Sequence, residues 1–192
     1  MSSRFDSARF SDYPLTVLAF HGTSEKVAES VLSGKSELKV SANPWEWLGN
    51  GVYFWENAPE RALRWAIERK KDKPTVVGAL IQVGRCLNLM DKSSNLPIVQ
   101  AYERSKKLFA MKGLDLPENS GKFHYRDAIV LNTLHSIADD NGVPYDTVRA
   151  SYIEGDPLYA GTDIRSDTHI QICVRDPKKS VIAYFRPREI IR

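Results

Sequence analysis

The first residues that could do chemistry lie in the segment FHGTS, residues 20–24, where a histidine and a glycine follow an apolar run. A histidine at the carboxyl end of a strand lies where a cleft can form. Gly22 has no Cβ, so a ligand can approach its backbone, and the N–H and C=O there can bind a planar amide. The alternative is a tight turn in which His21 is structural.

A second group is the aromatic segment around the glycine turn GNG, residues 49–51. All four tryptophans of the chain lie between residues 45 and 65, and Tyr53 and Phe54 lie among them. A flat, electron-rich ring is a good platform for a flat cation, and such a contact is worth roughly 0.5–2 kcal/mol. The alternative is that these rings form the core, in which case Phe54 and Trp55 point to opposite faces of a strand.

The segment THIQICVR, residues 168–175, alternates between apolar and polar residues, which is typical of a strand. The two faces are Ile170, Ile172 and Val174, and His169, Gln171, Cys173 and Arg175. If this strand borders a cleft, Gln171 and His169 face the ligand. The commoner reason for such alternation is a solvated sheet face.

The strands and helices that must position these residues are themselves predicted from the sequence. Their order indicates an α+β fold, because strands come first, helices lie in the middle and strands return. Strands are predicted at 14–20, 37–41, 75–83, 145–152, 168–175 and 180–185, with GVYFW after the glycine turn. Helices are predicted after a cap at Thr23 or Ser24, after a cap at Asn57, and at 97–111 and 125–139. Residues 1–13 are predicted to be an arm, and 14–192 one domain with a helical insertion at 85–145.

Composition excludes several classes of protein. The 192 residues carry a net charge of +3, which permits contact with a polyanion without requiring it. The two cysteines form no CxxC pair, so we expect neither a disulfide framework nor a metal site. The N-terminal residues lack an apolar signal segment, and no apolar run is long enough to span a membrane, so we expect a cytoplasmic protein. P-loop, GxGxxG, HExxH and GxSxG motifs are absent from the sequence, which disfavours nucleoside triphosphatases and dehydrogenases.

The motifs of residues 20–66, read together, resemble the NAD-binding half of the diphtheria-toxin and poly(ADP-ribose)-polymerase class of ADP-ribosyltransferases. The matching features are FHGTS, the helix ending in LSG, and GNGVYFW followed by an alanine-rich helix. The late segment IQICVRDPKKSVIAYF, residues 170–185, resembles the paired strands that carry the third motif residue of the class. The whole chain is also similar to a group of small bacterial enzymes of this class. The resemblance implies a split β-sheet core with an NAD cleft between its two sheets, flanked by helices.

The resemblance also implies roles for the residues of these motifs. His21 would bind a ribose hydroxyl of NAD, and the Gly22 backbone would hold the nicotinamide carboxamide. The Tyr53 ring would stack on the nicotinamide, and Ser41 would support the site from behind. The remaining cofactor-binding candidates lie beside these residues in the same motifs and are Thr23 and Gly51.

The sequence departs from the class at its third motif position, where Gln171 replaces a glutamate. Loss of one charged group of this kind costs roughly 3 kcal/mol of transition-state stabilisation. Three outcomes are open: Gln171 suffices for slow transfer of a single ADP-ribose, Glu154 in the preceding loop acts as the acid, or NAD is bound without turnover. We favour the first two, and with them transfer of a single unit rather than a polymer.

The acceptor is expected to meet the loop 154–168, which occupies the place where this class reads its acceptor. Arg149, one strand away, is a candidate for binding a pyrophosphate or an acceptor phosphate. Mild basicity and many aromatic residues lean towards RNA or DNA over protein as the acceptor. A bacterial toxin or phage-defence effector is the expected setting, with an antitoxin or chaperone as a further partner.

Two other functions stay open at this level. An inactive relative that binds NAD or ADP-ribose fits the presence of Gln171, and release of nicotinamide from NAD separates it from an enzyme. An RNA 2'-phosphotransferase of the same fold is the other alternative, although such an enzyme needs a more basic pocket than HGTS and GVYFW supply.

Overall fold

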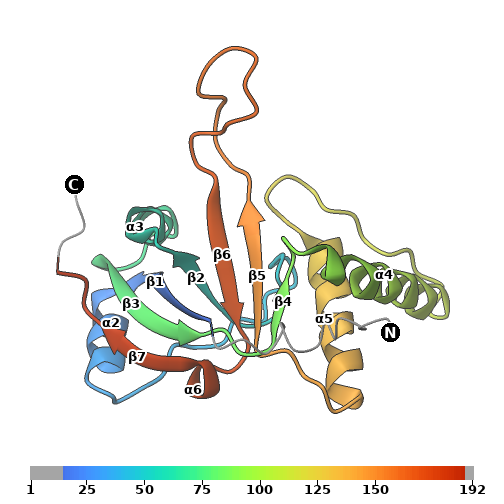
Figure 1. Ribbon diagram of the computed structural model, residues 1–192, viewed down its shortest axis with the longest axis horizontal. Coiled ribbons are helices and arrows are strands. Elements are labelled where there is room, and N and C mark those ends of the chain that lie inside the picture. The colour runs from blue at the N-terminus through green and yellow to red at the C-terminus, as the bar shows by residue number, and fades with distance from the viewer. Residues whose placement is uncertain (1–14, 189–192) are drawn as a thin grey trace, which may run out of the picture.

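The computed structural model describes residues 15–188 and has an α+β fold, as the sequence predicts (Figure 1). The predicted arm, residues 1–13, lies outside the described residues. In chain order the elements are β1 (Thr16–Ser24), α2 (Glu25–Leu32), β2 (Val52–Glu56), α3 (Pro59–Glu68), β3 (Pro74–Gln82), β4 (Cys86–Asn88), a 3-10 turn (Lys92–Ser94), α4 (Asn95–Ala110), α5 (Tyr125–Asp140), β5 (Thr147–Tyr152), β6 (His169–Val174), α6 (Pro177–Ser180) and β7 (Val181–Phe185).

Within residues 15–188 the strands form one seven-stranded sheet in the order β4-β5-β6-β2-β1-β3-β7. Neighbouring strands are antiparallel except for β4 and β5, which are parallel. The sequence resemblance predicts two separate sheets, whereas the structure joins both halves through β1 and β2. That junction is narrow, because only Ala19↔Glu56 and Phe20↔Trp55 are paired.

Strand β1 is longer than the predicted segment 14–20, and its partner β3 explains the difference. The two strands pair without interruption from Thr16↔Gln82 to Ser24↔Pro74. The continuous partner holds His21, Gly22 and Thr23 in extended backbone, so they lie within the strand rather than in a turn after it.

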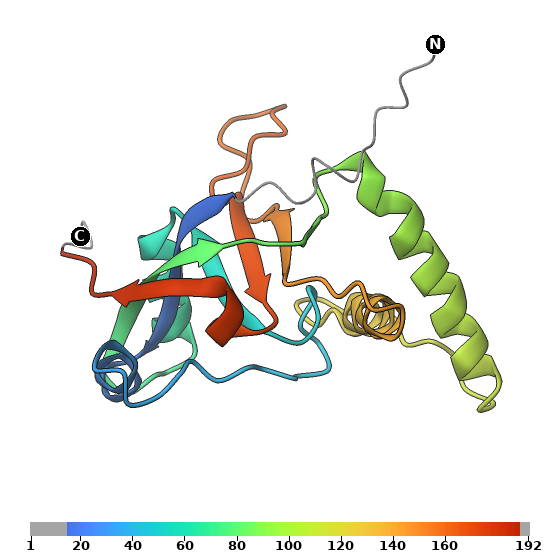
Figure 2. The same ribbon diagram turned by 60° about the horizontal axis from the view of Figure 1, so that its bottom comes forward.

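The helices cover both faces of the sheet and one of its ends (Figures 1 and 2). Helix α3 packs on β1, β2 and β3, and α2 packs on β1 and β3. Helices α4 and α5 pack on each other beside the β4 end of the sheet. Helices α4 and α5 confirm the helices predicted at 97–111 and 125–139. The segment predicted as a helical insertion also contains β4, which extends the sheet.

The buried residues form clusters on the two faces of the sheet, and β2 contributes to both. Val52 and Phe54 pack in a cluster with Ala19 and Ile172. Trp55 lies in a different cluster beneath α3. Phe54 and Trp55 thus point to opposite faces, as predicted for strand neighbours, but both are buried.

Two local predictions are wrong. Residues 37–41 form no strand, because only Ser41 meets a neighbour, in a single bridge to Gly51. Asn57 does not cap α3; it has a φ of 51°, and the capping position falls on Ala58. The N–H of Asn57 donates to the carbonyl of Leu18, so this residue is still joined to β1 where the chain turns towards the helix.

The hairpin loop between β5 and β6, residues 153–168, stands out from the body of the protein (Figure 1). Its tip is closed by a bridge between Pro157 and Arg165. Within residues 15–188 we find no helix with the length and apolar character needed to cross a membrane.

Candidate active site

The β1–β2 ladder ends at Phe20↔Trp55, two residues before Gly22 and Tyr53, which lie opposite each other in the same register. The N–H of Glu25 donates to Lys73 and the N–H of Val83 donates to Leu15, so the odd-numbered residues of β1 bond towards β3. In an antiparallel ladder the bonding direction alternates along a strand, so the even-numbered residues bond towards β2. The N–H and C=O of Gly22 therefore face β2 at the point where the ladder has ended.

His21 takes the place of a strand partner for Tyr53. Its Nδ1 lies 2.8 Å from the Tyr53 carbonyl oxygen, which can only accept, so Nδ1 carries the proton. Burial lowers the pKa of His21, and nearby Lys71 lowers it further, against the opposing effect of that hydrogen bond. The imidazole is therefore neutral at pH 7, and its Nε2 is a hydrogen-bond acceptor.

The His21 ring lies between Phe54 of β2 and Trp65 of α3, with ring centroids 5.7 Å and 6.2 Å away. The Tyr53 ring packs instead against the cluster that contains Leu48. Among residues 15–188 the two side chains are not joined by a hydrogen bond or a ring contact; His21 reaches the backbone of Tyr53 rather than its phenol.

The Tyr53 hydroxyl is held by the glycine turn that precedes β2. It donates to the Gly49 carbonyl at 2.8 Å and accepts from the Leu48 N–H at 3.0 Å. Burial raises the pKa of this phenol well above its usual range, so it stays protonated. The ring is consequently fixed at its outer edge as well as at its backbone.

The packing of helix α3 on β1 requires a glycine at position 22, independently of any ligand. A Cβ at this position would fall on the carbonyl of Ala62 in α3 and crowd Ala66. Both alanines are fully buried. The missing side chain of Gly22 therefore admits helix α3, while its backbone N–H and C=O point sideways towards β2.

Gln171 lies on β6 beside Trp55 of β2, and its amide is fixed at both ends. Its Oε1 accepts from the Trp47 indole at 2.9 Å, since an indole N–H can only donate. Its Nε2 lies 2.9 Å from Nε2 of His169. His169 donates from Nδ1 to the Asp167 carbonyl at 2.7 Å, so its Nε2 is left to accept from the amide.

Gln171 and His169 are 7% and 9% exposed, so the polar face of β6 is buried rather than solvated. Burial lowers the pKa of His169, which supports the neutral ring that the hydrogen bonds require. A carboxylate at position 171 would present an oxygen lone pair to an unprotonated Nε2. The network thus has a physical reason to hold glutamine.

Glu154 comes from the base of the protruding loop and lies beside the same histidine. One carboxylate oxygen is 3.9 Å from His169 Nδ1. Arg61 of α3 binds Glu154 through Nε at 3.1 Å and Nη2 at 3.0 Å, and its guanidinium lies over Trp55. The acid is therefore held beside His169 by a cation from the helix.

The other predicted binding residues lie away from this network. Arg149 forms a two-point ion pair with Glu56, at 2.7 Å and 3.0 Å, and is committed to that partner. Ser41 bridges to Gly51 through backbone hydrogen bonds and donates from its hydroxyl to Glu46. The contacts of Ser41 with Gly51 and Glu46 hold the loop 42–50 closed.

Thr23 and Gly51 also have structural surroundings. Thr23 is buried within β1 and does not cap α2, whose capping position is Ser24. A Cβ on Gly51 would fall on the Cys173 sulfur of β6, so this glycine permits close approach of the turn to the sheet.

Sequence reasoning missed three residues that the fold brings to the site: Trp47, Arg61 and Trp65. Arg61 and Trp65 are four residues apart and so share one face of α3, a spacing that could have linked them. No local signal joins Trp47 to Gln171, because 124 residues separate them.

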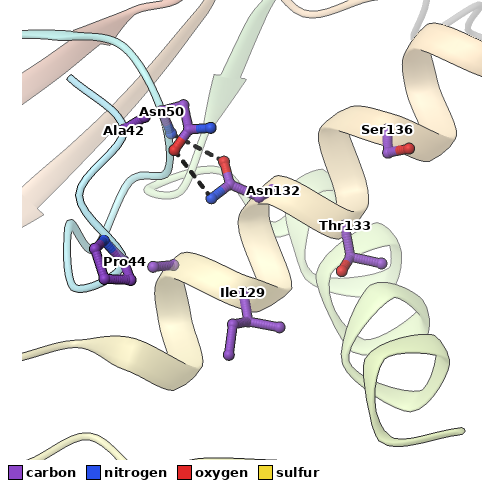
Figure 3. Close-up of a pocket in the computed structure, with 8 residues that line it drawn as sticks. Ala42, Pro44, Asn50, Ile129, Asn132, Thr133 and Ser136 are labelled. Carbon is purple, nitrogen blue, oxygen red and sulfur yellow. Dashed lines mark hydrogen bonds between the residues drawn. The ribbon is translucent and has the colours of Figure 1, made fainter. Parts of the chain in front are cut away.

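A surface hollow lies elsewhere, between α5 and the loop 42–50 (Figure 3). Asn132 of α5 ties the loop down: its Oδ1 accepts from the Asn50 N–H at 2.9 Å, and its Nδ2 donates to the Asn50 side chain at 3.3 Å. The residues lining this hollow do not include His21, Tyr53 or Gln171. The two hydrogen bonds between Asn132 and Asn50 anchor the loop that carries Trp47 to α5.

Neither the family models nor the curated proteins that were compared with the chain match it. Within residues 15–188, no group of three or more His, Cys, Asp or Glu side chains is placed to hold a metal ion.

Proposed function

We propose that this chain is an NAD-dependent mono-ADP-ribosyltransferase with the fold of that superfamily, in which the short β1–β2 pairing joins the two halves of the sheet. The observation that carries the proposal is the interrupted ladder, in which the backbone of Gly22 faces β2 while His21 satisfies the carbonyl of Tyr53. Where the pairing of a strand stops beside a glycine, the backbone N–H and C=O of that glycine remain as one donor and one acceptor for a ligand.

The nicotinamide carboxamide is the group that we assign to this edge. Its oxygen accepts from the Gly22 N–H and its nitrogen donates to the Gly22 C=O, as a neighbouring strand would. The neutral Nε2 of His21 accepts a hydrogen bond from a ribose hydroxyl, because Nδ1 is already engaged with Tyr53. This division of roles requires the tautomer that the Tyr53 carbonyl imposes.

Two rings support the assignment of a flat, cationic ligand. The Tyr53 hydroxyl is anchored at Leu48 and Gly49, so its ring is preorganised as a platform. Trp65 lies beside His21 on the α3 side. Contact between an aromatic face and a desolvated cation is worth about 2 kcal/mol.

The reaction breaks the bond between the nicotinamide nitrogen and the ribose carbon C1', and the bonding electrons leave with nicotinamide. An acceptor nucleophile then forms a bond to C1' and gives up its proton. Positive charge develops on the ribose, as in glycoside cleavage. Glu154, 3.9 Å from His169, supplies the negative charge, and Gln171 binds a ribose hydroxyl through its second N–H.

Transfer of a single unit fits a site whose third motif residue is an uncharged amide. A toxin or phage-defence role inside the bacterial cytoplasm is the setting that we propose, with a cognate antitoxin or chaperone restraining it. Arg61 replaces Arg149 as our candidate for contacting an NAD or acceptor phosphate: each is paired with a carboxylate, but the buried Nη1 of Arg61 has no hydrogen-bond partner within the described residues.

The test is release of nicotinamide from NAD by the purified protein, followed by transfer of label from NAD to a cell lysate. We expect release above the buffer rate, and label that is lost on treatment with nuclease or with protease, according to the acceptor. Glu154→Gln should slow release by about a hundredfold if the carboxylate acts on the ribose. Measurable NAD binding with no release by any preparation would contradict the proposal.

A second candidate function is an NAD- or ADP-ribose-binding module without turnover. The observation that favours it is the fixed amide of Gln171, held by Trp47 and His169 where the class has a free carboxylate. Titration calorimetry with NAD and ADP-ribose, in parallel with the nicotinamide assay, separates binding from catalysis.

A further inference from the structure

Two segments far apart in the sequence place alternating aromatic residues side by side. Trp45 and Trp47 lie in the loop before β2, and Phe123, His124 and Tyr125 lie at the start of α5. The His124 N–H donates to the Trp45 carbonyl at 3.2 Å and joins the segments. We call the rings of these residues, with that of Tyr152 at the end of β5, the aromatic shelf.

The outer part of the shelf consists of three rings that contact one another. Trp45 meets Phe123 and Tyr125 edge-on, with centroid distances of 5.8 Å and 6.4 Å. Phe123 and Tyr125 are stacked, 5.9 Å apart and 24° from parallel. These rings belong to none of the buried clusters in residues 15–188, and Phe123 is exposed.

The inner part of the shelf leads to Gln171. Trp47 lies 5.1 Å from Tyr152 and 6.4 Å from His124. Its indole N–H donates to the Gln171 oxygen. Tyr152 lies 5.6 Å from the His169 ring. The shelf therefore runs from the surface to the amide that we place beside the ribose.

An exposed cation lies beside the outer rings of the shelf. Lys122 lies 5.9 Å from the Phe123 ring centroid and is exposed. Two carboxylates adjoin the shelf and keep their negative charge, because their hydrogen-bond donors are neutral: Glu46 accepts from Ser41 and Asn43, and Asp127 accepts from Asn119 and lies 3.5 Å from His124. A cation next to flat, partly exposed rings suits a ligand that alternates phosphates with flat bases.

We propose that the aromatic shelf binds the bases of single-stranded nucleic acid. Every base has a face that stacks on an aromatic ring, so such binding tolerates many sequences. A duplex is a poor ligand because its bases are stacked on one another. The role of this strand as the acceptor rests on the proposed transferase function, whereas the binding itself does not.

The test is fluorescence anisotropy of a labelled oligomer of about 12 nucleotides, as RNA and as DNA, without NAD. We expect the single strands to bind and the matching duplex to bind much more weakly. Trp45→Ala and Phe123→Leu should each weaken binding by about tenfold. Phe123→Leu keeps an apolar side chain and removes only the flat face. Met111→Ala, which removes an exposed apolar side chain at the end of α4, should bind as the unaltered protein does.

Thermal melting of each variant verifies that it is folded. Absence of binding by both single strands, or unchanged binding by both folded shelf variants, would overturn the proposal. Displacement of the bound oligomer by equimolar NAD would also overturn it, because the shelf would then hold the adenine of the dinucleotide. The assay involves no turnover, so failure of nicotinamide release would leave this binding result unaffected.

Discussion

The amide nitrogen of Gln171 lies 2.9 Å from Nε2 of His169, and that histidine nitrogen accepts because Nδ1 donates to the Asp167 carbonyl. This relationship explains why a glutamine occupies the position where the resemblance implies a glutamate. An amide satisfies a neutral histidine and an indole N–H at once. A carboxylate satisfies only the indole unless the histidine gains a proton.

Replacement of Gln171 by glutamate should therefore raise the pKa of His169 above its ordinary value, reversing the lowering caused by burial. At pH 8 the variant should lose about 1–3 kcal/mol of stability, since a buried lone pair faces another. The loss should shrink as the pH falls and His169 gains a proton. Histidine ring NMR and denaturant unfolding measure both effects. Gln82→Glu, an exposed strand-end glutamine, serves as the control.

The Trp47 indole should act by positioning the Gln171 amide. Trp47→Phe keeps a ring but leaves the Gln171 oxygen without its donor, which should cost about 1–3 kcal/mol of stability. Nicotinamide release should fall in kcat more than it changes in KM, because the amide loses its orientation. The matched control is Trp45→Phe, where no hydrogen bond of the indole to residues 15–188 is lost. If Trp47→Phe and Trp45→Phe changed stability and kcat equally, the positioning role of Trp47 would be contradicted.

His21 and Tyr53 should respond differently to substitution. His21→Ala removes the hydroxyl acceptor and the bond to the Tyr53 carbonyl, so nicotinamide release should fall by roughly a hundredfold or more. Tyr53→Phe keeps the platform ring and should retain release within a few-fold, while stability falls by about 1–3 kcal/mol as Leu48 and Gly49 lose a partner. A Tyr53→Phe variant that is stable but inactive would assign chemistry to the hydroxyl instead.

His135 should make stability depend on pH. It is buried in α5 beside Leu48 and Gly49, and neither ring nitrogen makes a hydrogen bond of good geometry within the described residues. Burial lowers its pKa from 6.5 to about 4. The unfolded chain then binds more protons than the folded chain below pH 6.5, so stability is complete above that pH and is lost as the pH falls towards 4. The loss should reach about 2–3 kcal/mol.

His135→Leu should remove the contribution of His135 to this pH dependence, while those of His21 and His169 remain, and should raise stability at pH 5, because an apolar side chain needs no partner. Denaturant unfolding at several pH values measures the difference. His124→Leu, a half-buried histidine on the aromatic shelf, is the comparison that should retain the acid-induced loss. An unaltered pH profile in His135→Leu would show that other groups control acid stability.

The sequence by itself determined the α+β class and most of the strands and helices, because alternation and helical spacing are local properties of the chain. Local signals failed where a neighbour decided the outcome. The strand β1 continues through His21 because β3 lies beside it, and residues 37–41 form no strand because only Ser41 finds a partner.

The residues of the candidate site could be picked from the sequence by type, but their partners could not. Gln171 meets Trp47, Glu154 meets Arg61, and Arg149 is taken up by Glu56, in each case across 93 or more residues. Such contacts depend on how the strands are ordered in the sheet, which local sequence patterns do not encode. Tertiary structure alone decided that the histidine binds the tyrosine backbone, and that glutamine is matched to a neutral histidine.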